Sequence, residues 1–452
     1  RYADGLVAAR ALATEARAVA YRPFQAEALF ELGRLQEVTG DYAAAADSLR
    51  DAGIDAEAGR DDRIAARAWI QLVWVIGARL GKADEAQTLA REAEAKLERA
   101  GADDLMLAEL DRVRGQLASD AGKAAVALDY AQRVLALRRK ASPDDVAAIA
   151  LAESDVADAL AQQGTYDQAI AQYRDALADM ERAVGADHPM RISTLTNLAT
   201  ALRAQAHYDE ALAVFDRAEA IAIEVYGPDH PTLATIYMDR GGVERAQGKL
   251  DAASAHYDRA LAIWTRALGP DHANVGTVHY YRGSVALEQG RIDLAIGEFE
   301  RARDIWQRAL GPDNPSLSAA YAGLGDARLA KGDARGALAA YERGIALIEK
   351  ALGPTHPDLA NGLTGAGLAR LALGDPRRAV ASLERALAIR VADPGDPVDL
   401  ARTQFGLARA LVAAGGDRGR ARDLAEHARA AFAASPTGQR EAAAVEAWRA
   451  RL

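Results

Sequence analysis

Hydrophobic residues recur along this chain every three or four positions, and polar residues fill the positions between them. The segment DAASAHYDRALAIWTRAL at 251–268 is a clear example. This spacing places the apolar side chains on one face of a helix. No segment alternates apolar and polar residues in the manner of a strand, so the pattern predicts an all-helical protein.

The helical pattern is copied at a fixed period of 42 residues. One set of positions marks this period and is named the turn series here: Gly164, Ala206, Gly248, Gly290, Gly332 and Gly374. Gly40, Gly81 and Gly122 continue the series upstream at steps of 41 or 42 residues. Such self-similarity indicates one supersecondary unit that is repeated about ten times.

Three columns of residues predict how the helices of a repeat pack. Five positions after each turn-series residue stands an alanine, and four positions further on stands a large residue: Tyr173, Phe215, Tyr257, Phe299, Tyr341 or Leu383. Seven positions before the turn series stand small residues: Ala157, Ala199, Gly241, Gly283, Gly325 and Gly367. We expect the missing side chains of this last column to let two helices approach closely.

These columns resemble the tetratricopeptide repeat over nearly the whole chain. The 42-residue period, with segments such as ALGPDHA at 267–273 between repeats, is similar to the longer variant found in kinesin light chains and in many bacterial proteins. The resemblance implies a right-handed superhelical solenoid of about ten helix pairs. A capping helix from about Thr437 to Leu452 would present Trp448 and Leu452 to the last repeat. Divergent repeats would occupy 1–140, regular repeats 141–394, and the last repeat with the cap 395–452.

The N-terminal part is similar to the region that follows the kinase domain in large bacterial serine/threonine kinases. The segments that carry this resemblance are AEALFELGRLQEVTGDYAAAADSLRDA at 26–52 and DDRIAARAWIQLVWVIGARLGKADEAQ at 61–87. The 452 residues themselves contain no glycine-rich phosphate loop and no HRD or DFG motif. The chain begins with Arg1 and has no signal-peptide pattern. We therefore expect a segment of a longer bacterial signalling protein, in which a kinase domain would precede Arg1.

A five-residue motif of the type GPDHP also recurs every 42 residues, at 185, 227, 269, 311 and 353. We interpret it as a bend between repeats, in which the glycine ends a helix in a left-handed conformation and the first proline stops it. Asp or Asn would cap the next helix, and the second proline suits its first turn. The alternative is a metal site built from His188, His230, His272 and His356. Successive repeats would hold these side chains about 10 Å apart, too far to share one ion.

Composition excludes several functions. The chain has 65 acidic and 55 basic residues, a formal charge of −10, which disfavours nucleic acid as a partner. It has no cysteine, which favours a reducing compartment such as the cytoplasm. No stretch is apolar enough for a membrane helix. HExxH, GxSxG and GxxxxGK motifs are absent, so we predict neither an enzyme nor a bound cofactor or metal in this segment.

In tetratricopeptide proteins, the first helices of the repeats line a concave face that binds extended peptides. Positions ten, nine and six before each turn-series residue point into this face, and we name them the groove register. They are polar, aromatic or small rather than aliphatic, as a binding surface requires. The predicted partner-binding residues are Asp155, Asp158, Asn197, Thr200, Asp239, Tyr280, Tyr281, Ser284 and Asp326.

Asn197 occupies the place where related repeats carry an asparagine that hydrogen-bonds a peptide backbone. Other repeats have Asp155, Asp239, Tyr281 or glycine in the same column, so a solvated polar residue is the equal alternative for Asn197. Tyr280 and Tyr281 are contact candidates, although one of them should pack between helices.

Three functional readings follow from the sequence. We favour an interaction scaffold that binds a partner polypeptide, extended and locally basic because aspartates dominate the groove register. The second reading is a sensor that responds to a small peptide or metabolite. The third, an enzyme with an active site at one end, has the least support. The sequence does not indicate the oligomeric state.

Overall fold

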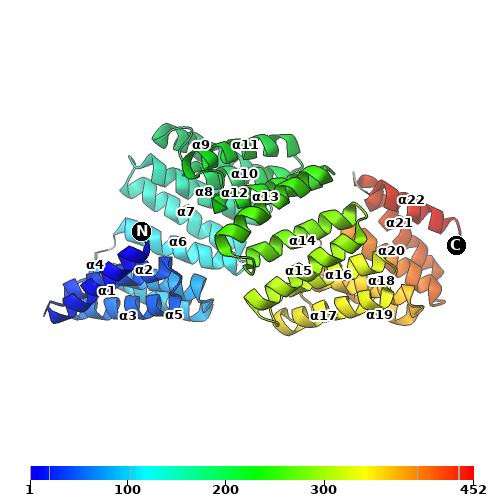
Figure 1. Cartoon of the computed structure of the whole chain (residues 1–452), viewed down its shortest axis with the longest axis horizontal. Helices are drawn as coiled ribbons and strands as arrows, with labels where there is room; N and C mark the ends of the chain where they lie inside the picture. The colour runs from blue at the N-terminus through cyan, green and yellow to red at the C-terminus, as the bar shows by residue number, and fades with distance from the viewer. Residues whose placement is uncertain (1, 20, 102, 394, 436–437) are drawn as a thin grey trace. The chain divides into compact units, whose positions relative to one another are not determined.

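A computed structural model describes residues 2–19, 21–101, 103–393, 395–435 and 438–452. These residues form helices joined by short turns, with no strand among them, which confirms the all-helical prediction. The chain divides into two compact units, Arg1–Val225 and Tyr226–Leu452, named unit 1 and unit 2 here. The colour gradient of Figure 1 follows the helices in order along the chain.

Unit 1 contains the first eleven helices. They are α1 (Tyr2–Ala18), α2 (Arg22–Val38), α3 (Tyr42–Ala58), α4 (Asp62–Trp74), α5 (Ala83–Arg99), α6 (Asp104–Asp120), α7 (Ala124–Ala141), α8 (Val146–Gln162), α9 (Tyr166–Val184), α10 (Arg191–Ala204) and α11 (Tyr208–Tyr226), whose last residue passes the boundary. A π-helical segment, Val75–Arg79, continues α4. Consecutive helices pack as hairpins, for example α2 on α3, α6 on α7 and α8 on α9.

Unit 2 repeats this arrangement. Its helices are α12 (Pro231–Ala246), α13 (Leu250–Leu268), α14 (Ala273–Glu288), α15 (Ile292–Leu310), α16 (Leu317–Ala330), α17 (Ala334–Leu352), α18 (Leu359–Ala372), α19 (Pro376–Ala392), α20 (Pro397–Ala413), α21 (Arg418–Ala434) and α22 (Gln439–Arg449). The pairs α12/α13, α14/α15, α16/α17, α18/α19 and α20/α21 are the successive repeats. The even-numbered helix is the first helix of each repeat, as it is for α8 and α10 in unit 1.

Small and large residues meet across each helix pair as the columns predicted. A Cβ atom on Gly325 would lie 2.5 Å from the Tyr341 ring, and one on Gly283 would lie 2.9 Å from the Phe299 ring. Both rings are almost fully buried. Real Cβ atoms do not approach so closely, so at these two positions glycine makes room for the ring.

The turn series also has the expected backbone. Its glycines have positive φ angles, for example 76° at Gly164 and 74° at Gly290. Ala206 adopts the same conformation with φ of 59°, although alanine is disfavoured there. The fold therefore imposes the turn geometry even where the sequence departs from glycine.

The bends between repeats differ from the prediction in two respects. Gly269 has φ of 88° and ψ of 158°, so its φ is positive but its ψ is extended, outside the left-handed helical region. The capping residue is also one position later than predicted. His230 and His272 are the N-caps of α12 and α14, and their Nδ1 atoms accept the backbone N–H groups of Thr232 and Asn274.

The assignment of the cap to Asp in these repeats was therefore wrong. In α12 and α14 the imidazole Nδ1 atom accepts an N–H group of the first turn of the helix. Asn314, His188 and His356 accept the N–H groups of Ser316, Met190 and Asp358, which directly precede α16, α10 and α18, so they order the bend without capping the helix. The repeated histidines thus have a structural role that accounts for their period.

The C-terminal helix α22 covers the last repeat. Val445 is fully buried and the Trp448 ring packs edge-on against Phe405, with centroids 5.5 Å apart. The predicted closing helix and the packing of Trp448 are thus confirmed, whereas Leu452 is only half-buried. The predicted first residue, Thr437, lies outside the described residues. The three-part division of the chain stays a prediction.

Candidate functional site

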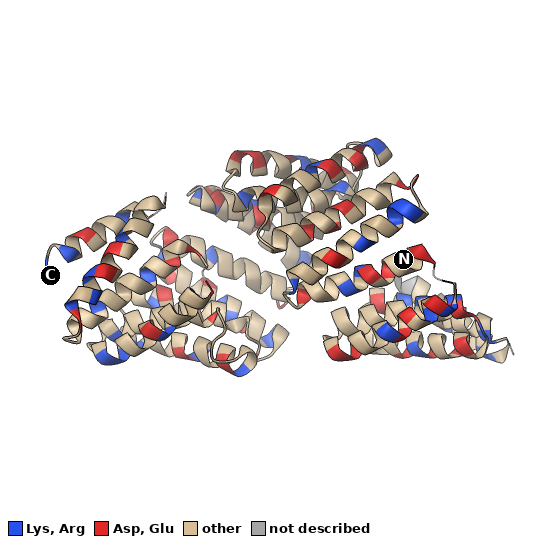
Figure 2. Cartoon of the chain, turned by 180° about the vertical axis from the view of Figure 1, so that it is seen from behind, with Lys and Arg blue, Asp and Glu red and all other residues tan. Residues whose placement is uncertain are grey.

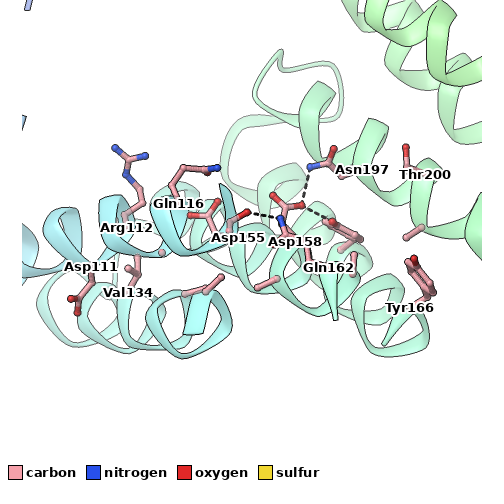
Figure 3. A pocket seen from close by; sticks show the side chains of 18 residues that line it. Asp111, Arg112, Gln116, Val134, Asp155, Asp158, Gln162, Tyr166, Asn197 and Thr200 are labelled. Carbon is pink, nitrogen blue, oxygen red and sulfur yellow. Dashed lines mark hydrogen bonds between the residues drawn. The ribbon is translucent and has the colours of Figure 1, made fainter. Parts of the chain in front are cut away.

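Four of the predicted groove residues lie together in unit 1. Asp155 and Asp158 on α8, and Asn197 and Thr200 on α10, line one cavity of about 480 Å³, named the unit-1 cavity here. Figure 3 shows these side chains along one side of the cavity, with Gln116 and Arg112 of α6 beside them. The groove register of two consecutive repeats therefore converges on a single hollow.

Small residues on the surrounding helices make room for this cavity. Gly115 of α6, Ala127 and Ala131 of α7, and Ala159 of α8 all contribute to its lining. Helices pack side by side at fixed distances, so a cluster of short side chains leaves a space that longer ones would fill.

The carboxylate of Asp158 is held by two neighbours. Its Oδ1 accepts hydrogen bonds from the Tyr173 hydroxyl and from Asn197 Nδ2, the latter at 2.8 Å. Burial raises the pKa of Asp158, and the two donors oppose this effect. Asn197 is thus neither free nor merely solvated, because it helps to orient a carboxylate at the cavity wall.

Asp155 lies in a different situation. Within the described residues, its carboxylate makes no hydrogen bond and no ion pair. Burial, followed by repulsion from Asp158 and Glu109, raises the pKa of Asp155 to about 6, although Arg112 and Arg138 partly offset the shift. Asp155 is therefore a half-buried acidic group on the wall of a cavity, and the described residues give it no hydrogen bond or ion pair.

A second cavity, of about 510 Å³, lies in unit 2 and is named the unit-2 cavity. Tyr280 and Tyr281 of α14 line it, together with Ala319 and Ala322 of α16 and Asn361 of α18. Its floor is apolar, and the residues that form it include Trp306, Tyr341, Ile345 and Ile348. This cavity thus spans the first helices of three consecutive repeats.

The two tyrosines differ in their packing. The Tyr280 ring lies 5.7 Å from the Phe299 ring and 5.8 Å from the Trp306 ring, within the core of its repeat. Tyr281 stacks on Tyr257, with centroids 5.7 Å apart. Tyr280 therefore fulfils the expectation that one of the pair packs between helices.

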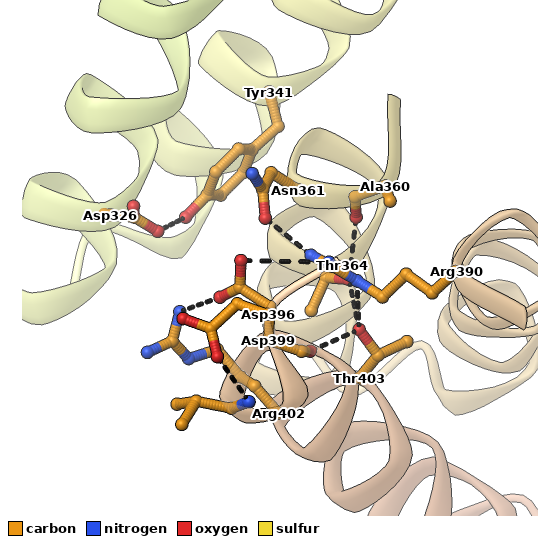
Figure 4. A network of polar contacts seen from close by, with 11 residues as sticks. Asp326, Tyr341, Ala360, Asn361, Thr364, Arg390, Asp396, Asp399, Arg402 and Thr403 are labelled. Atoms are coloured by element: carbon orange, nitrogen blue, oxygen red, sulfur yellow. Dashed lines mark hydrogen bonds and ion pairs between the residues drawn. The ribbon is translucent and has the colours of Figure 1, made fainter. Parts of the chain in front are cut away.

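A polar network holds Asn361, one of the residues that line the unit-2 cavity (Figure 4). The buried guanidinium of Arg390 donates to Asn361 Oδ1 at 2.6 Å and to Thr403 Oγ1 at 3.1 Å. Burial lowers the pKa of Arg390, and Asp399 at 3.8 Å counteracts that shift. The amide of Asn361 is consequently held in one orientation.

The remaining predicted residues line neither cavity. Ser284 donates its hydroxyl to the Tyr280 carbonyl at 3.2 Å. Asp239 is half-buried on α12. Asp326 lies exposed on α16, where its Oδ1 accepts the Tyr341 hydroxyl at 2.6 Å. The structure thus does not gather all nine residues into one site.

Sequence reasoning missed a recurring carboxylate–tyrosine pair. Asp158 with Tyr173 and Asp326 with Tyr341 occupy the same two positions of their repeats, six before and nine after the turn. It also missed Arg112 and Gln116, which stand ten and six positions before Gly122. Extending the groove register one repeat upstream would have found both residues.

The helix pairs, their columns and their turns define a tetratricopeptide-repeat protein, a class that mediates protein–protein interaction. The chain belongs to the family described as the MalT-like TPR region, which matches residues 156–432. Residues 6–61 match a second family, described as tetratricopeptide repeat. No curated protein matches the sequence.

Solved structures with a similar fold include the apo form of RapI, with a TM-score of 0.57 and 11% identity over 81% of this chain and 97% of RapI. A STAND protein with a tetratricopeptide repeat sensor, PH0952 from Pyrococcus horikoshii, has a TM-score of 0.52 and 14% identity over 77% of this chain and 52% of that one. A putative kinesin light chain from Podosopora anserina has a TM-score of 0.40 and 21% identity over 46% of this chain and 99% of that one. At these identities the likeness to RapI and PH0952 concerns the fold alone.

None of the described helices combines the length and apolar character that a membrane span requires. Acidic and basic residues are interspersed over the helices of both units (Figure 2).

Proposed function

We propose that this protein is an interaction scaffold whose first helices bind an extended segment of a partner polypeptide. The observation that carries the proposal is the convergence of groove-register residues on a cavity in each unit. We further propose that the scaffold is the regulatory part of a larger bacterial signalling protein that acts in the cytoplasm. The similarity of residues 26–52 to segments that follow bacterial kinase domains motivates this second step.

The two cavities differ in the side chains that they favour. Polar groups and two carboxylates dominate one side of the unit-1 cavity, which therefore favours basic or amide side chains. Aromatic and aliphatic groups form the floor of the unit-2 cavity, which favours an apolar or aromatic side chain. A partner segment that combines both kinds of residue would have specific contacts in each unit.

The overall charge of −10 supports a locally basic partner. Charges exposed to solvent act over about 8 Å at physiological salt, so they mainly set the rate and selectivity of association. Buried aromatic contacts and hydrogen bonds would determine how slowly the partner dissociates.

A ligand-responsive sensor is the second candidate. The volumes of about 480 and 510 Å³ fall within the range of small-molecule pockets, and this observation favours it. Such a sensor would bind a short peptide or metabolite rather than a segment of a folded partner.

Filling both cavities tests the proposal. The immobilised wild-type protein, a Thr200→Arg/Ala322→Arg variant and an Ala171→Arg control are incubated with extract of the source cells. Ala171 is exposed on α9 and lines neither cavity, so the control carries a similar surface change. We expect the wild type and the control to retain the same polypeptide, and the filled variant to lose it.

Retention of that polypeptide by the filled variant would refute groove binding. A thermal shift of the wild type with a low-molecular-weight fraction, without a retained polypeptide, would favour the sensor instead.

A further inference from the structure

We propose that the unit-1 cavity binds the side chain of a lysine residue in the partner polypeptide, with its ammonium group between Asp155 and Asp158. This inference rests on the proposed function and specifies the chemistry of one contact in it. Three features support it: the cavity, the carboxylate of Asp155 and the residues that line the cavity.

Asp155 supplies a charge that nothing in the described part of the chain neutralises by contact. Its carboxylate makes no ion pair there, although it is half-buried on the cavity wall. Desolvated charges are costly unless they are paired. An ammonium group that enters the cavity would supply the missing partner.

Asp158 supplies a second, oriented carboxylate one helical turn away. Its Oδ1 is occupied by Tyr173 and Asn197, which fix the plane of the group. Within the described residues its Oδ2 makes no hydrogen bond and stays available as an acceptor. Figure 3 shows Asp155 and Asp158 side by side on α8, with the Asn197 amide directed at Asp158.

The residues that line the unit-1 cavity suit a lysine side chain, which has an aliphatic part and a terminal ammonium group. Ala127, Ala131 and Val134 form an apolar part of the lining, which would contact the four methylene groups of lysine. Gln116 and Gln162 also line the cavity, and their Nε2 atoms donate to Asp120 and Ser119. Three N–H donors arranged around one nitrogen match acceptors on separate residues, here Asp155 and the Oδ2 atom of Asp158.

The cations near the cavity already have partners. Arg112 Nη2 lies 2.7 Å from Glu109 Oε1, and Arg138 Nη2 lies 3.9 Å from Glu109 Oε2. The charged and titratable groups nearest Asp155 are Asp158 on its own helix, Arg112 and Glu109 on α6, and Arg138 on α7, with the one Glu109 carboxylate shared by the two arginines. Asp111 of α6 also lines the cavity and is paired with Arg133 at 3.0 Å. Tyr173 of α9 is neutral at physiological pH, because burial raises its pKa further. The net charge of these groups is negative, which favours the binding of a cation.

Protons and the lysine would compete for Asp155. The free protein holds a proton on this group below about pH 6, because burial and Asp158 raise its pKa to about 6. A bound ammonium would lower that pKa, so binding releases a proton under acidic conditions. Affinity should therefore be constant above pH 7 and fall about tenfold for each pH unit well below 6.

The test uses the full chain and a probe that carries one lysine side chain, Nα-acetyl-lysine N-methylamide, in a saturation-transfer NMR titration. We compare the wild type with Asp155→Asn and with Asp313→Asn, which removes the same charge from an exposed site paired with Lys350. At pH 7.5 we expect affinity to be at least about tenfold weaker for Asp155→Asn, because the substitution removes a charged hydrogen-bond acceptor for the ammonium group. Asp313→Asn should bind as the wild type does, and acetylation of the probe's Nε should abolish binding.

Several results would overturn the assignment. Equal affinity of the wild type and Asp155→Asn, or no loss of wild-type affinity between pH 7.5 and 5, would place the ammonium elsewhere. Tighter binding of the arginine analogue would assign a guanidinium to the cavity instead of an ammonium. If the probe does not bind but the filled variant still loses the partner, the lysine contact is wrong while the proposed function stands.

Discussion

Replacing Asp155 by asparagine should stabilise the free protein at neutral pH. The substitution keeps the shape of the side chain and removes a charge that has no contact partner in the described residues. The rise from the ordinary pKa of 3.8 to about 6 corresponds to roughly 3 kcal/mol of destabilisation once the group is ionised. Because Asp155 keeps some contact with solvent, we expect a smaller gain of about 1–2 kcal/mol.

The sign of the effect depends on pH. A carboxyl group whose pKa is raised by folding destabilises the folded state above that pKa, and the penalty disappears as pH falls below the unfolded value. The advantage of Asp155→Asn should therefore be full at pH 7.5, diminish through pH 6 and approach zero near pH 4. Comparing both proteins at each pH cancels the titration of all other groups.

Hydrogen–deuterium exchange of the α8 amides, read by mass spectrometry, suits this measurement, because repeat proteins open locally. The α8 amides of the variant should exchange more slowly by a factor of about 5–30 at pH 7.5, after correction for intrinsic exchange, because α8 opens less often. The control is Asp313→Asn, whose carboxyl pKa is held down by Lys350 and which should bring no gain. Faster opening of α8 in Asp155→Asn at pH 7.5, or the same difference at pH 4.5, would refute the reasoning.

Four further predictions concern the repeats and the groove. Ala206→Gly should raise the free energy of unfolding by about 0.5–1 kcal/mol in urea titrations, because glycine tolerates the positive φ at that turn. Gly325→Ala should destabilise by about 1–3 kcal/mol, because its Cβ would overlap a buried ring, whereas Gly297→Ala, where nothing lies within 4 Å, should not destabilise. Trp448→Ala should lower stability by about 2 kcal/mol and promote aggregation, seen by light scattering, by uncovering the last repeat. Tyr281→Ala should weaken partner binding in calorimetry at any salt concentration, whereas loss of the unit-1 carboxylates should matter most at low salt.

The fold could be predicted from the sequence because its determinants are short-range and steric. Glycines at a 42-residue period need positive φ, and a missing side chain at Gly283 or Gly325 leaves space for a neighbouring ring. These requirements are visible in single residues. The capping residue at the bend was harder to predict from the sequence, because His and Asp are adjacent and both can accept a hydrogen bond. Only the path of the backbone determines that His230 reaches the free N–H group.

The candidate site could be predicted only in part. The groove register selected Asp155, Asp158, Asn197 and Thr200 correctly as neighbours, because first helices of consecutive repeats lie next to each other. It could not show that Asp158 and Asp326 would each accept a tyrosine hydroxyl, which depends on side-chain rotamers. The groove register also could not show where along the first helices a cavity forms. Cavities arise where small residues from several helices coincide, as Gly115 and Ala159 do in unit 1.

Two rings in unit 2 each lie between two glycines, and this has a consequence for the number of repeats. Phe299 lies against Gly283 of its own repeat and against Gly323 of the next, and Tyr341 lies in the same way against Gly325 and Gly365. The junctions before and after the α16/α17 repeat are therefore alike. Duplication or loss of this 42-residue block would recreate the same contact, so this part of the chain can change by one repeat without a new interface.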